Sequence, residues 1–230
     1  MTFVFPPPPQ PSAAIATGER RFPVRRIFCV GRNYADHVRE MGNDPRTEPP
    51  LFFTKPADAI VESGAAIPYA SNTSNLHHEV ELVIAIGKAG ANIAVADSLG
   101  HAWGYGVGVD LTRRDRQAEA KKAGTPWDTA KGFDRSAPLG ALTPASEAGD
   151  ISSARIWLSV NGEIRQEAST SGMIWNVAEI ISALSQWWTL AAGDLIFTGS
   201  PAGVGALEPG DRIECGVAGL APLSFSIIPR

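Results

Sequence analysis

Cysteine is scarce in this chain of 230 residues, which has only Cys29 and Cys215. Both lie in strand-like segments, where thiols are commonly buried. The N-terminal residues show no basic stretch followed by an apolar stretch, so we expect no secretory signal. Two buried thiols without such a signal predict a protein of the reducing cytoplasm.

Long apolar runs and basic clusters are also missing. No apolar run approaches the roughly 20 residues that a membrane-spanning helix needs, so we expect no membrane insertion. The net charge is −4, and no basic run is longer than the pairs Arg20-Arg21 and Arg25-Arg26. Because proteins hold phosphate backbones with positively charged surfaces, we expect no nucleic-acid partner.

Glycine and proline, by contrast, are frequent, with 23 and 18 residues. Their frequency predicts many turns between short strands and a modest helix content, which is typical of a mostly-β protein of the α+β class. Residues 1–23, with four consecutive prolines, are interpreted as an extended arm. The chain is 44% hydrophobic, enough for one sizeable core, so residues 24–230 are interpreted as a single domain.

The segment 77–87 begins polar and ends apolar, which predicts a central strand with both faces covered. Because side chains alternate along a strand, Glu79 and Glu81 point to the same side. Two carboxylates at the mouth of an apolar strand repel each other and are costly to desolvate. A hard divalent cation would relieve both problems, but so would a lysine or arginine opposite them, and both interpretations stay open at this point.

A second carboxylate position follows a strand with alternating glycines, residues 103–109. These glycines leave one face of the strand bare, which lets a ligand or another backbone approach closely. Asp110 ends this strand. It is either a third carboxylate of a metal site or the N-cap of the helix predicted over 112–123. On that helix Arg114 and Gln117 lie three residues apart, where they could reach an anionic ligand.

Two further groups offer acid–base chemistry. His37 and Glu40 lie three residues apart on a predicted helical turn, where a carboxylate raises the basicity of an imidazole, as a general base requires. An ordinary surface pair explains the same spacing. Lys55 precedes a proline at a strand end, and Lys131 precedes a glycine at an apparent strand start. Each is either a site residue or a solvated lysine, and the local pattern favours the solvated interpretation.

Three other segments have clear patterns. An Asn-Gly pair at 161–162, between two strand-like runs, is typical of a tight β-hairpin. Residues 176–188 carry apolar side chains at helical spacing after Asn176, a common N-cap residue, and this predicts a core helix. The glycine-rich turn 198–205 follows a buried strand and offers backbone N–H groups to an anion. Its spacing is not that of a nucleotide-binding loop.

Taken together, five motifs in this order resemble the fumarylacetoacetate hydrolase family. They span roughly residues 24–228, and their order is more specific than any single motif. Within the family, the arm, residues 53–59 and residues 110–117 are most similar to the bacterial members that cleave acylpyruvates, the fumarylpyruvate hydrolases. The five motifs are residues 31–41, 77–82, 108–115, 131–134 and 198–205.

The resemblance implies a mixed β-sandwich or roll with peripheral helices, in which 24–230 is the catalytic domain, and it implies a homodimer. It also implies Mg²⁺ as the cofactor, with Mn²⁺ or Ca²⁺ as alternatives, bound by Glu79, Glu81 and Asp110. The family pattern has a second threonine where this chain has Ser200, and the hydroxyl is kept. The other implied site residues are catalytic His37, Glu40 and Lys131, and the substrate contacts Arg114, Gln117 and Thr198.

The activity that the resemblance implies is hydrolysis of a C–C bond in a 2,4-dioxo acid, foremost fumarylpyruvate, which gives fumarate and pyruvate. His37, polarised by Glu40, would activate the water, and Lys131 with the metal would stabilise the enolate charge. One alternative uses the same metal site for oxaloacetate decarboxylation or keto–enol isomerisation. An alternative of another class is a non-catalytic ligand-binding β domain. The water-activating pair favours hydrolysis, because decarboxylation needs no activated water.

Overall fold

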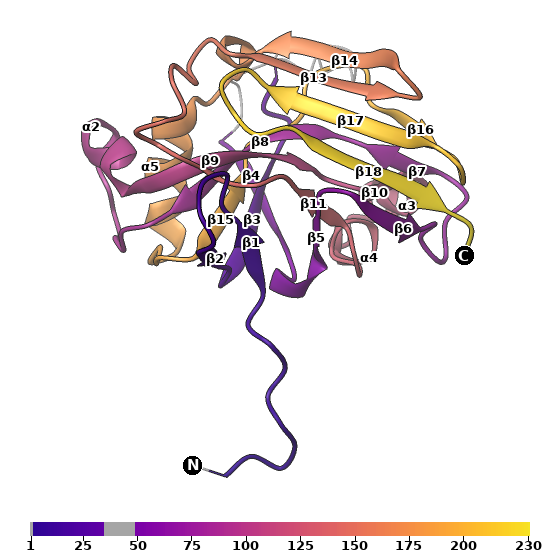
Figure 1. Ribbon diagram of the computed structural model, residues 1–230, viewed down its shortest axis with the longest axis horizontal. Coiled ribbons are helices and arrows are strands. Elements are labelled where there is room, and N and C mark those ends of the chain that lie inside the picture. The colour runs from indigo at the N-terminus through magenta and orange to yellow at the C-terminus, as the bar shows by residue number, and fades with distance from the viewer. Residues whose placement is uncertain (1, 35–48) are drawn as a thin grey trace.

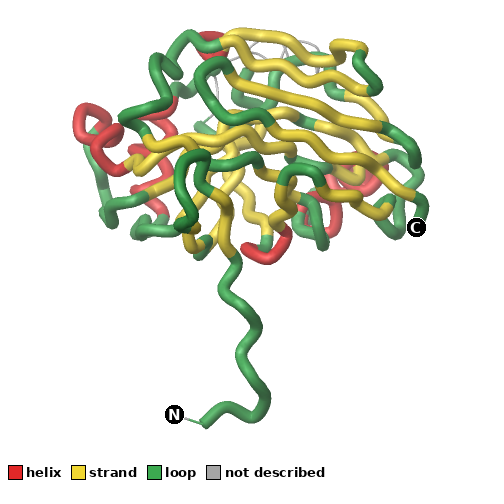
Figure 2. Tube along the Cα trace, viewed as in Figure 1, coloured by secondary structure: helices red, strands yellow, loops and turns green. Residues whose placement is uncertain are grey.

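Strands make up most of the fold, and the helices lie at its margin (Figure 2). The computed structural model describes residues 2–34 and 49–230. Two large sheets pack face to face, with two smaller sheets beside them (Figure 1). This arrangement confirms the mostly-β α+β class and the mixed sandwich or roll with peripheral helices.

The larger sheet runs in the order β4-β3-β15-β8-β9-β11-β5, and β12 pairs with β9. It is a mixed sheet, because β15 is parallel to β3 and antiparallel to β8. Its strands are β3 (Arg26–Gly31), β4 (Leu51–Lys55), β5 (Ile60–Glu62), β8 (Val80–Ile86), β9 (Ala102–Val109), β11 (Ala137–Leu139), β12 (Thr143–Pro144) and β15 (Asp194–Phe197).

The second sheet has the order β14-β13-β17-β18-β6, and a three-stranded sheet has the order β10-β7-β16. The predicted hairpin is confirmed as the turn between β13 and β14, where Asn161 and Gly162 have φ of 54° and 84°. The strands are β6 (Ala65–Pro68), β7 (Leu76–His78), β10 (Thr112–Arg113), β13 (Arg155–Val160), β14 (Glu163–Ser169), β16 (Gly205–Leu207), β17 (Arg212–Val217) and β18 (Leu223–Ile228).

The described helices are short, and α5 is the best formed of them. Asn176 caps α5 with its side chain, and Glu179 completes a capping box, so the predicted N-cap is confirmed. Ile180, Ile181 and Leu184 bury the apolar face of α5 in the main core, as the spacing predicts. The helices are α2 (Val95–Ser98), α3 (Arg114–Ala123), α4 (Asp128–Lys131) and α5 (Val177–Trp187).

Strand β8 is buried on both faces, as its apolar sequence predicts. Leu82 and Ile84 point into the core between the two large sheets, together with residues of β13 and β17. Val83 and Ala85 point the other way, into a second apolar cluster that contains Phe197. The strand therefore holds its polar end, which carries Glu81, rigidly in the middle of the fold.

Two sequence expectations around the helices are wrong in detail. The helix predicted over 112–123 begins at Arg114, because Thr112 and Arg113 pair with β7 as strand β10. Arg113 occupies the N-cap position, so Asp110 does not cap this helix. Lys131 lies at the end of α4, and no strand begins there. These shifts leave the carboxylate of Asp110 available for other partners.

The N-terminal segment divides into two parts. Strands β1 (Ser12–Ala14) and β2 (Arg21–Pro23) pair with each other and bury Ala13 and Phe22 against the second apolar cluster. Residues 2–10 are exposed and extend away from the sheets (Figure 1). Across the described parts of the chain, no helix is long and apolar enough to cross a membrane.

The bare face of β9 is filled by the protein itself. A Cβ at Gly104 would overlap the carbonyl oxygen of Thr143 in β12, and a Cβ at Gly108 would lie 2.5 Å from the ring of Phe197. The backbone of β12 and core side chains such as Phe197 therefore pack against this face. Because β8 and β9 pair from Val80 and Val109 onward, their polar ends lie next to each other.

Gly104→Ala is expected to lower the free energy of unfolding by about 1–3 kcal/mol, because the added methyl group has no space beside β12. Denaturant unfolding of both proteins measures this difference. Gly100→Ala is the matched control, since a Cβ at Gly100 meets no atom within 4 Å. Equal stability of Gly104→Ala and the parent would contradict the close packing of β9 against β12.

Candidate metal centre and active site

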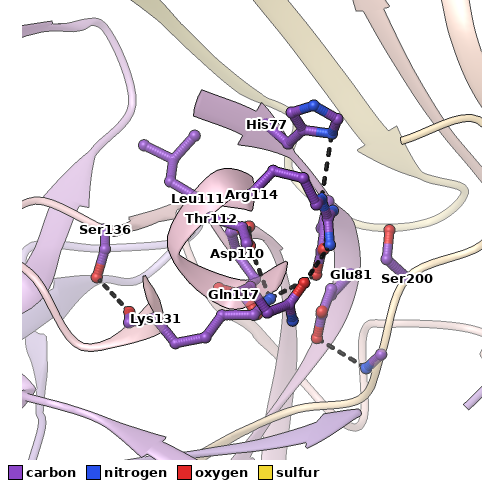
Figure 3. Close-up of polar contacts among 12 residues, drawn as sticks. His77, Glu81, Asp110, Leu111, Thr112, Arg114, Gln117, Lys131, Ser136 and Ser200 are labelled. Carbon is purple, nitrogen blue, oxygen red and sulfur yellow. Dashed lines mark hydrogen bonds and ion pairs between the residues drawn. The ribbon is translucent and has the colours of Figure 1, made fainter. Parts of the chain in front are cut away.

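The three carboxylates predicted as metal ligands converge at the paired ends of β8 and β9. Val80 lies opposite Val109, and the backbone N–H of Asp110 donates to the carbonyl of Glu79 at 2.8 Å. Glu79 and Asp110 therefore face each other just beyond the ladder. Asp110 and Glu81 are drawn in this cluster in Figure 3. Each residue offers an oxygen atom, and these three oxygens lie within 4.8 Å of one another. That separation suits the ligands of a single cation.

All three carboxylates are buried, with exposed fractions of 8% for Glu79, 2% for Glu81 and 0% for Asp110. Buried carboxylates require partners, because an isolated charge is costly away from water. The Lys131 ammonium lies 2.7 Å from Glu79 Oε2 and 2.6 Å from Asp110 Oδ2, and it also donates to Thr112 Oγ1 at 2.7 Å. Lys131 is thus part of the cluster (Figure 3), and the solvated interpretation of this lysine is wrong.

Lys55 is the second lysine of the cluster, and its predicted role as a solvated strand end is also wrong. Its side chain is fully buried, and Nζ lies 2.8 Å from Asp110 Oδ1. The angles of this ion pair do not satisfy a hydrogen bond, so Asp110 Oδ1 retains acceptor capacity for another ligand. Lys55 Nζ also donates to the backbone carbonyl of Lys131, which ties β4 to the end of α4.

Arg114 supplies the third positive charge. Its guanidinium forms an ion pair with Glu79, donates to Gln117 Oε1 at 2.6 Å and donates to His77 Nδ1 at 3.3 Å. Burial, followed by the charge of Arg114, lowers the pKa of His77 to about 4, so this imidazole is neutral and accepts the hydrogen bond. Arg114 and Gln117 are therefore brought to the carboxylates, as their spacing on the helix suggests.

Glu81 differs from the other two carboxylates, since it forms no ion pair within the described residues. It accepts the backbone N–H of Gly199 at 2.7 Å, so the glycine-rich turn binds a carboxyl group of the protein's own side chain. Burial, and then repulsion from Asp110 and Glu79, raise the pKa of Glu81 well above its usual range.

Glu79 shows the opposite balance. Burial alone would raise its pKa, but Lys131 and Arg114 outweigh burial and hold the pKa of Glu79 below its usual range. The pKa of Lys131 is raised, since Asp110 and Glu79 outweigh the effect of burial on the ammonium. Lys131 is therefore a permanently charged cation in the site.

The donor set fits a hard divalent cation. All three side chains offer carboxylate oxygens, which Mg²⁺, Mn²⁺ and Ca²⁺ prefer. Asp110 Oδ1 has acceptor capacity in reserve, and Glu81 has no ion-pair partner within the described residues. A cavity of about 30 Å³ lies against these three residues, which is room for an ion or a water molecule. The basic partners of one interpretation of the acidic strand are therefore present, and the same carboxylates could hold the cation of the other.

The predicted substrate contact Thr198 does not reach this cavity. Thr198 is fully buried, and its hydroxyl donates to the carbonyl of Leu82 at 2.8 Å, so it continues the pairing of β15 with β8. Ser200, two residues further on, does line the cavity, beside Glu81 (Figure 3). Strand alternation would place Thr198 and Ser200 on the same side. Gly199 between them has a φ of 97°, which ends the extended backbone and lets Ser200 turn toward the site, so this glycine is the missed signal.

His37 and Glu40, the predicted water-activating pair, lie outside the described residues. Their role stays a prediction. The other predicted site residues, apart from Thr198, all line the same cavity: Glu79, Glu81, Asp110, Arg114, Gln117 and Lys131.

Comparison with known proteins adds the family. A model described as fumarylacetoacetate (FAA) hydrolase C-terminal matches residues 26–228. Mitochondrial oxaloacetate tautomerase FAHD1 of Mus musculus is 45% identical over 203 residues, which cover 88% of this chain and 91% of the relative. Mitochondrial oxaloacetate decarboxylase of Dictyostelium discoideum is 41% identical over 208 residues, 90% of this chain and 95% of the relative. The cytoplasmic location expected from the cysteines stays a prediction.

A solved structure matches over the full length of both chains. It is the crystal structure of fumarylpyruvate hydrolase from Pseudomonas aeruginosa in complex with Mn²⁺ and pyruvate, with 48% identity, complete coverage of both chains and a TM-score of 0.97. The family model covers nearly the whole chain, and these proteins are 41–48% identical to it over the aligned residues. The predicted homodimer is untested by these matches and stays a prediction. The chain therefore belongs to the fumarylacetoacetate hydrolase family.

Proposed function

We propose that this protein acts on short 2-oxo acids beside a bound divalent cation, Mg²⁺ or Mn²⁺, and that oxaloacetate is the foremost substrate, through keto–enol tautomerisation or decarboxylation. One observation carries the proposal: Glu79, Glu81 and Asp110 converge within 4.8 Å, with the Lys131 ammonium bonded to two of them. Relatives named as oxaloacetate tautomerase and oxaloacetate decarboxylase support the choice of substrate.

Both reactions place negative charge on the 2-oxo oxygen. In decarboxylation the bond between C3 and C4 breaks, CO₂ leaves, and the electron pair forms the enolate of pyruvate, which then takes a proton at C3. In tautomerisation a proton moves between C3 and the 2-oxo oxygen. A cation bound by the three carboxylates would supply Lewis-acid polarisation of that oxygen. Lys131, held charged by its neighbours, would stabilise the same developing charge.

Arg114 and Gln117 are proposed to orient the substrate. The guanidinium of Arg114 is partly exposed and lies at the cavity between Glu79 and Gln117, so it can exchange one of these partners for a substrate carboxylate. Arginine suits this role because its planar fork binds a carboxylate with two hydrogen bonds. The hydroxyl of Ser200 replaces Thr198 in the proposed set of substrate contacts.

Hydrolysis of an acylpyruvate is the second candidate. A cavity of about 430 Å³, lined by Phe52, Phe53, Trp127 and Trp188, adjoins the metal cavity and shares Phe53, Trp127 and Lys131 with it. Such a space suits a longer acyl group, and a fumarylpyruvate hydrolase with bound pyruvate matches the whole chain. This reaction also forms the pyruvate enolate, but it requires an activated water at the 4-carbonyl, the role proposed for His37 and Glu40.

A substrate panel tests these proposals. Purified protein with Mn²⁺ is expected to accelerate enol-to-keto conversion or decarboxylation of oxaloacetate, measured by ultraviolet absorbance and by coupled pyruvate detection, and a chelator should abolish the acceleration. Assays with Mn²⁺ alone control for the reaction of the free ion. Turnover confined to fumarylpyruvate and acetylpyruvate would favour the second candidate, and absence of any turnover would favour a ligand-binding domain.

A further inference from the structure

Gln166 is a buried amide on a strand that is otherwise mostly exposed. It lies on β14, an edge strand of the second sheet, and is 1% exposed. An apolar side chain would be the less costly occupant of such a position. Gln166 instead makes four hydrogen bonds, two through each end of its amide. The amide is thus fully satisfied, and its partners lead toward the metal cavity.

The orientation of this amide is determined by two backbone groups. The N–H of Val80 lies 3.1 Å from Oε1, and because this group is a donor, the atom facing it must be the oxygen. The carbonyl of Pro201 lies 2.9 Å from Nε2, and because this group is an acceptor, the atom facing it must be the nitrogen. His78 Nδ1, 2.8 Å from Oε1, must therefore carry the proton.

The remaining hydrogen bond of Gln166 reaches Ser200. Nε2 donates to Ser200 Oγ at 2.8 Å, so Ser200 is an acceptor in this contact and its own O–H is directed elsewhere. Within the described residues no group accepts that O–H, and Ser200 lines the metal cavity. The hydroxyl is consequently prepared to donate to an anionic oxygen bound there.

We infer that Gln166 is a positioning residue: by donating to Ser200 it directs the Ser200 hydroxyl toward a carboxylate or oxyanion of the substrate, while His78 holds the Gln166 amide in place. The inference rests on the proposed function in that it needs a 2-oxo acid in the metal cavity. It connects the second sheet, through residues remote in sequence, to the site on the larger sheet.

A double-mutant cycle tests the inference by pyruvate binding to the Mn²⁺-loaded protein, measured by isothermal titration calorimetry. Ser200→Ala is expected to weaken pyruvate binding about tenfold, as for a lost hydrogen bond to a charged group. Gln166→Leu is expected to weaken it about three- to tenfold in the parent but less than about twofold in the Ser200→Ala background. A purely structural Gln166 would have the same effect in both backgrounds, and that result would overturn the inference.

Controls separate positioning from folding. Thr170→Val removes another buried hydrogen-bonding side chain near the end of β14, remote from the cavity, and pyruvate affinity should stay within about twofold of the parent's. Gln166→Met takes the place of Gln166→Leu in the double-mutant cycle if the leucine variant does not fold. Mn²⁺ affinity, measured for every variant, should be unchanged.

Binding also distinguishes this inference from the proposed function. A parent that binds pyruvate with Mn²⁺ but turns over no member of the substrate panel would contradict the proposed function and leave the cycle valid. A parent that binds Mn²⁺ but no pyruvate overturns the inference. A crystal structure of the parent with Mn²⁺ and pyruvate adds a test without variants: Ser200 Oγ should lie within hydrogen-bond distance of both Gln166 Nε2 and a pyruvate oxygen, and a longer distance to either overturns the inference.

Discussion

Glu81→Gln is expected to fold like the parent and to bind Mn²⁺ at least about 100-fold more weakly, with loss of metal-dependent turnover. The fold should persist because Glu81 takes part in no ion pair within the described residues, and a glutamine oxygen can still accept the N–H of Gly199. The raised pKa of Glu81 points the same way, since a neutral amide resembles a protonated carboxyl. Metal binding is lost because an amide oxygen lacks the charge of a carboxylate ligand.

Titration calorimetry with Mn²⁺ and thermal unfolding measure the two halves of this prediction. Glu167→Gln is the matched control, because Glu167 is an exposed carboxylate paired with Arg155 and remote from the cavity. It should leave both quantities unchanged. If Glu81→Gln binds Mn²⁺ with the affinity of the parent, then the three carboxylates do not form the metal site.

Lys131→Met is expected to lower turnover by about 10²–10³-fold while metal binding is retained. The ammonium contacts two of the proposed ligands, Glu79 and Asp110, so its loss removes the group that would stabilise charge on the 2-oxo oxygen. The metal-free variant should also be less stable by about 3–5 kcal/mol, because Glu79 and Asp110 lose a buried positive partner. Addition of Mn²⁺ should therefore raise its melting temperature more than it raises that of the parent.

Kinetics with saturating Mn²⁺ and thermal unfolding with and without Mn²⁺ check this prediction. Lys122→Met is the control, since Lys122 is an exposed lysine at the end of α3. A variant of Lys131 that is as active as the parent would exclude the lysine from the reaction. A variant that Mn²⁺ stabilises no more than the parent would show that the lysine and the cation do not compensate the same charges.

The elements with strong local patterns could be predicted closely. Val160–Glu163 forms its hairpin, and α5 begins after Asn176, because a turn or a cap is specified by residues a few positions apart. The alternation that places Glu79 and Glu81 on one side depends only on the period of a strand. The start of α3 was missed, because Thr112 and Arg113 pair with β7, a contact that no local propensity encodes.

The lysines illustrate what local patterns cannot show. Lys55 and Lys131 have the sequence surroundings of solvated residues, yet both are buried against Asp110. Their burial follows from the positions of β4, α4 and β9 in space. The attraction between the lysines and the carboxylates offsets the cost of desolvating these charges. Ser200 lines the cavity where Thr198 was expected, because Thr198 is bonded into the pairing of β15 with β8 and the chain turns after it at Gly199.

By itself, the sequence determined the ordered motifs, the mostly-β class, the hairpin, the capped helix and the placement of Glu79 and Glu81 on one side of a strand. These features depend on residue chemistry and on short-range periodicity. The tertiary structure alone decided that Asp110 meets Glu79 and Glu81 within 4.8 Å, that two lysines compensate their charge, and that Gln166 and His78 lie behind Ser200. The physical reason is that burial, repulsion and hydrogen bonding act between atoms that neighbour each other in space, and strand pairing brings together residues that lie dozens of positions apart in the chain.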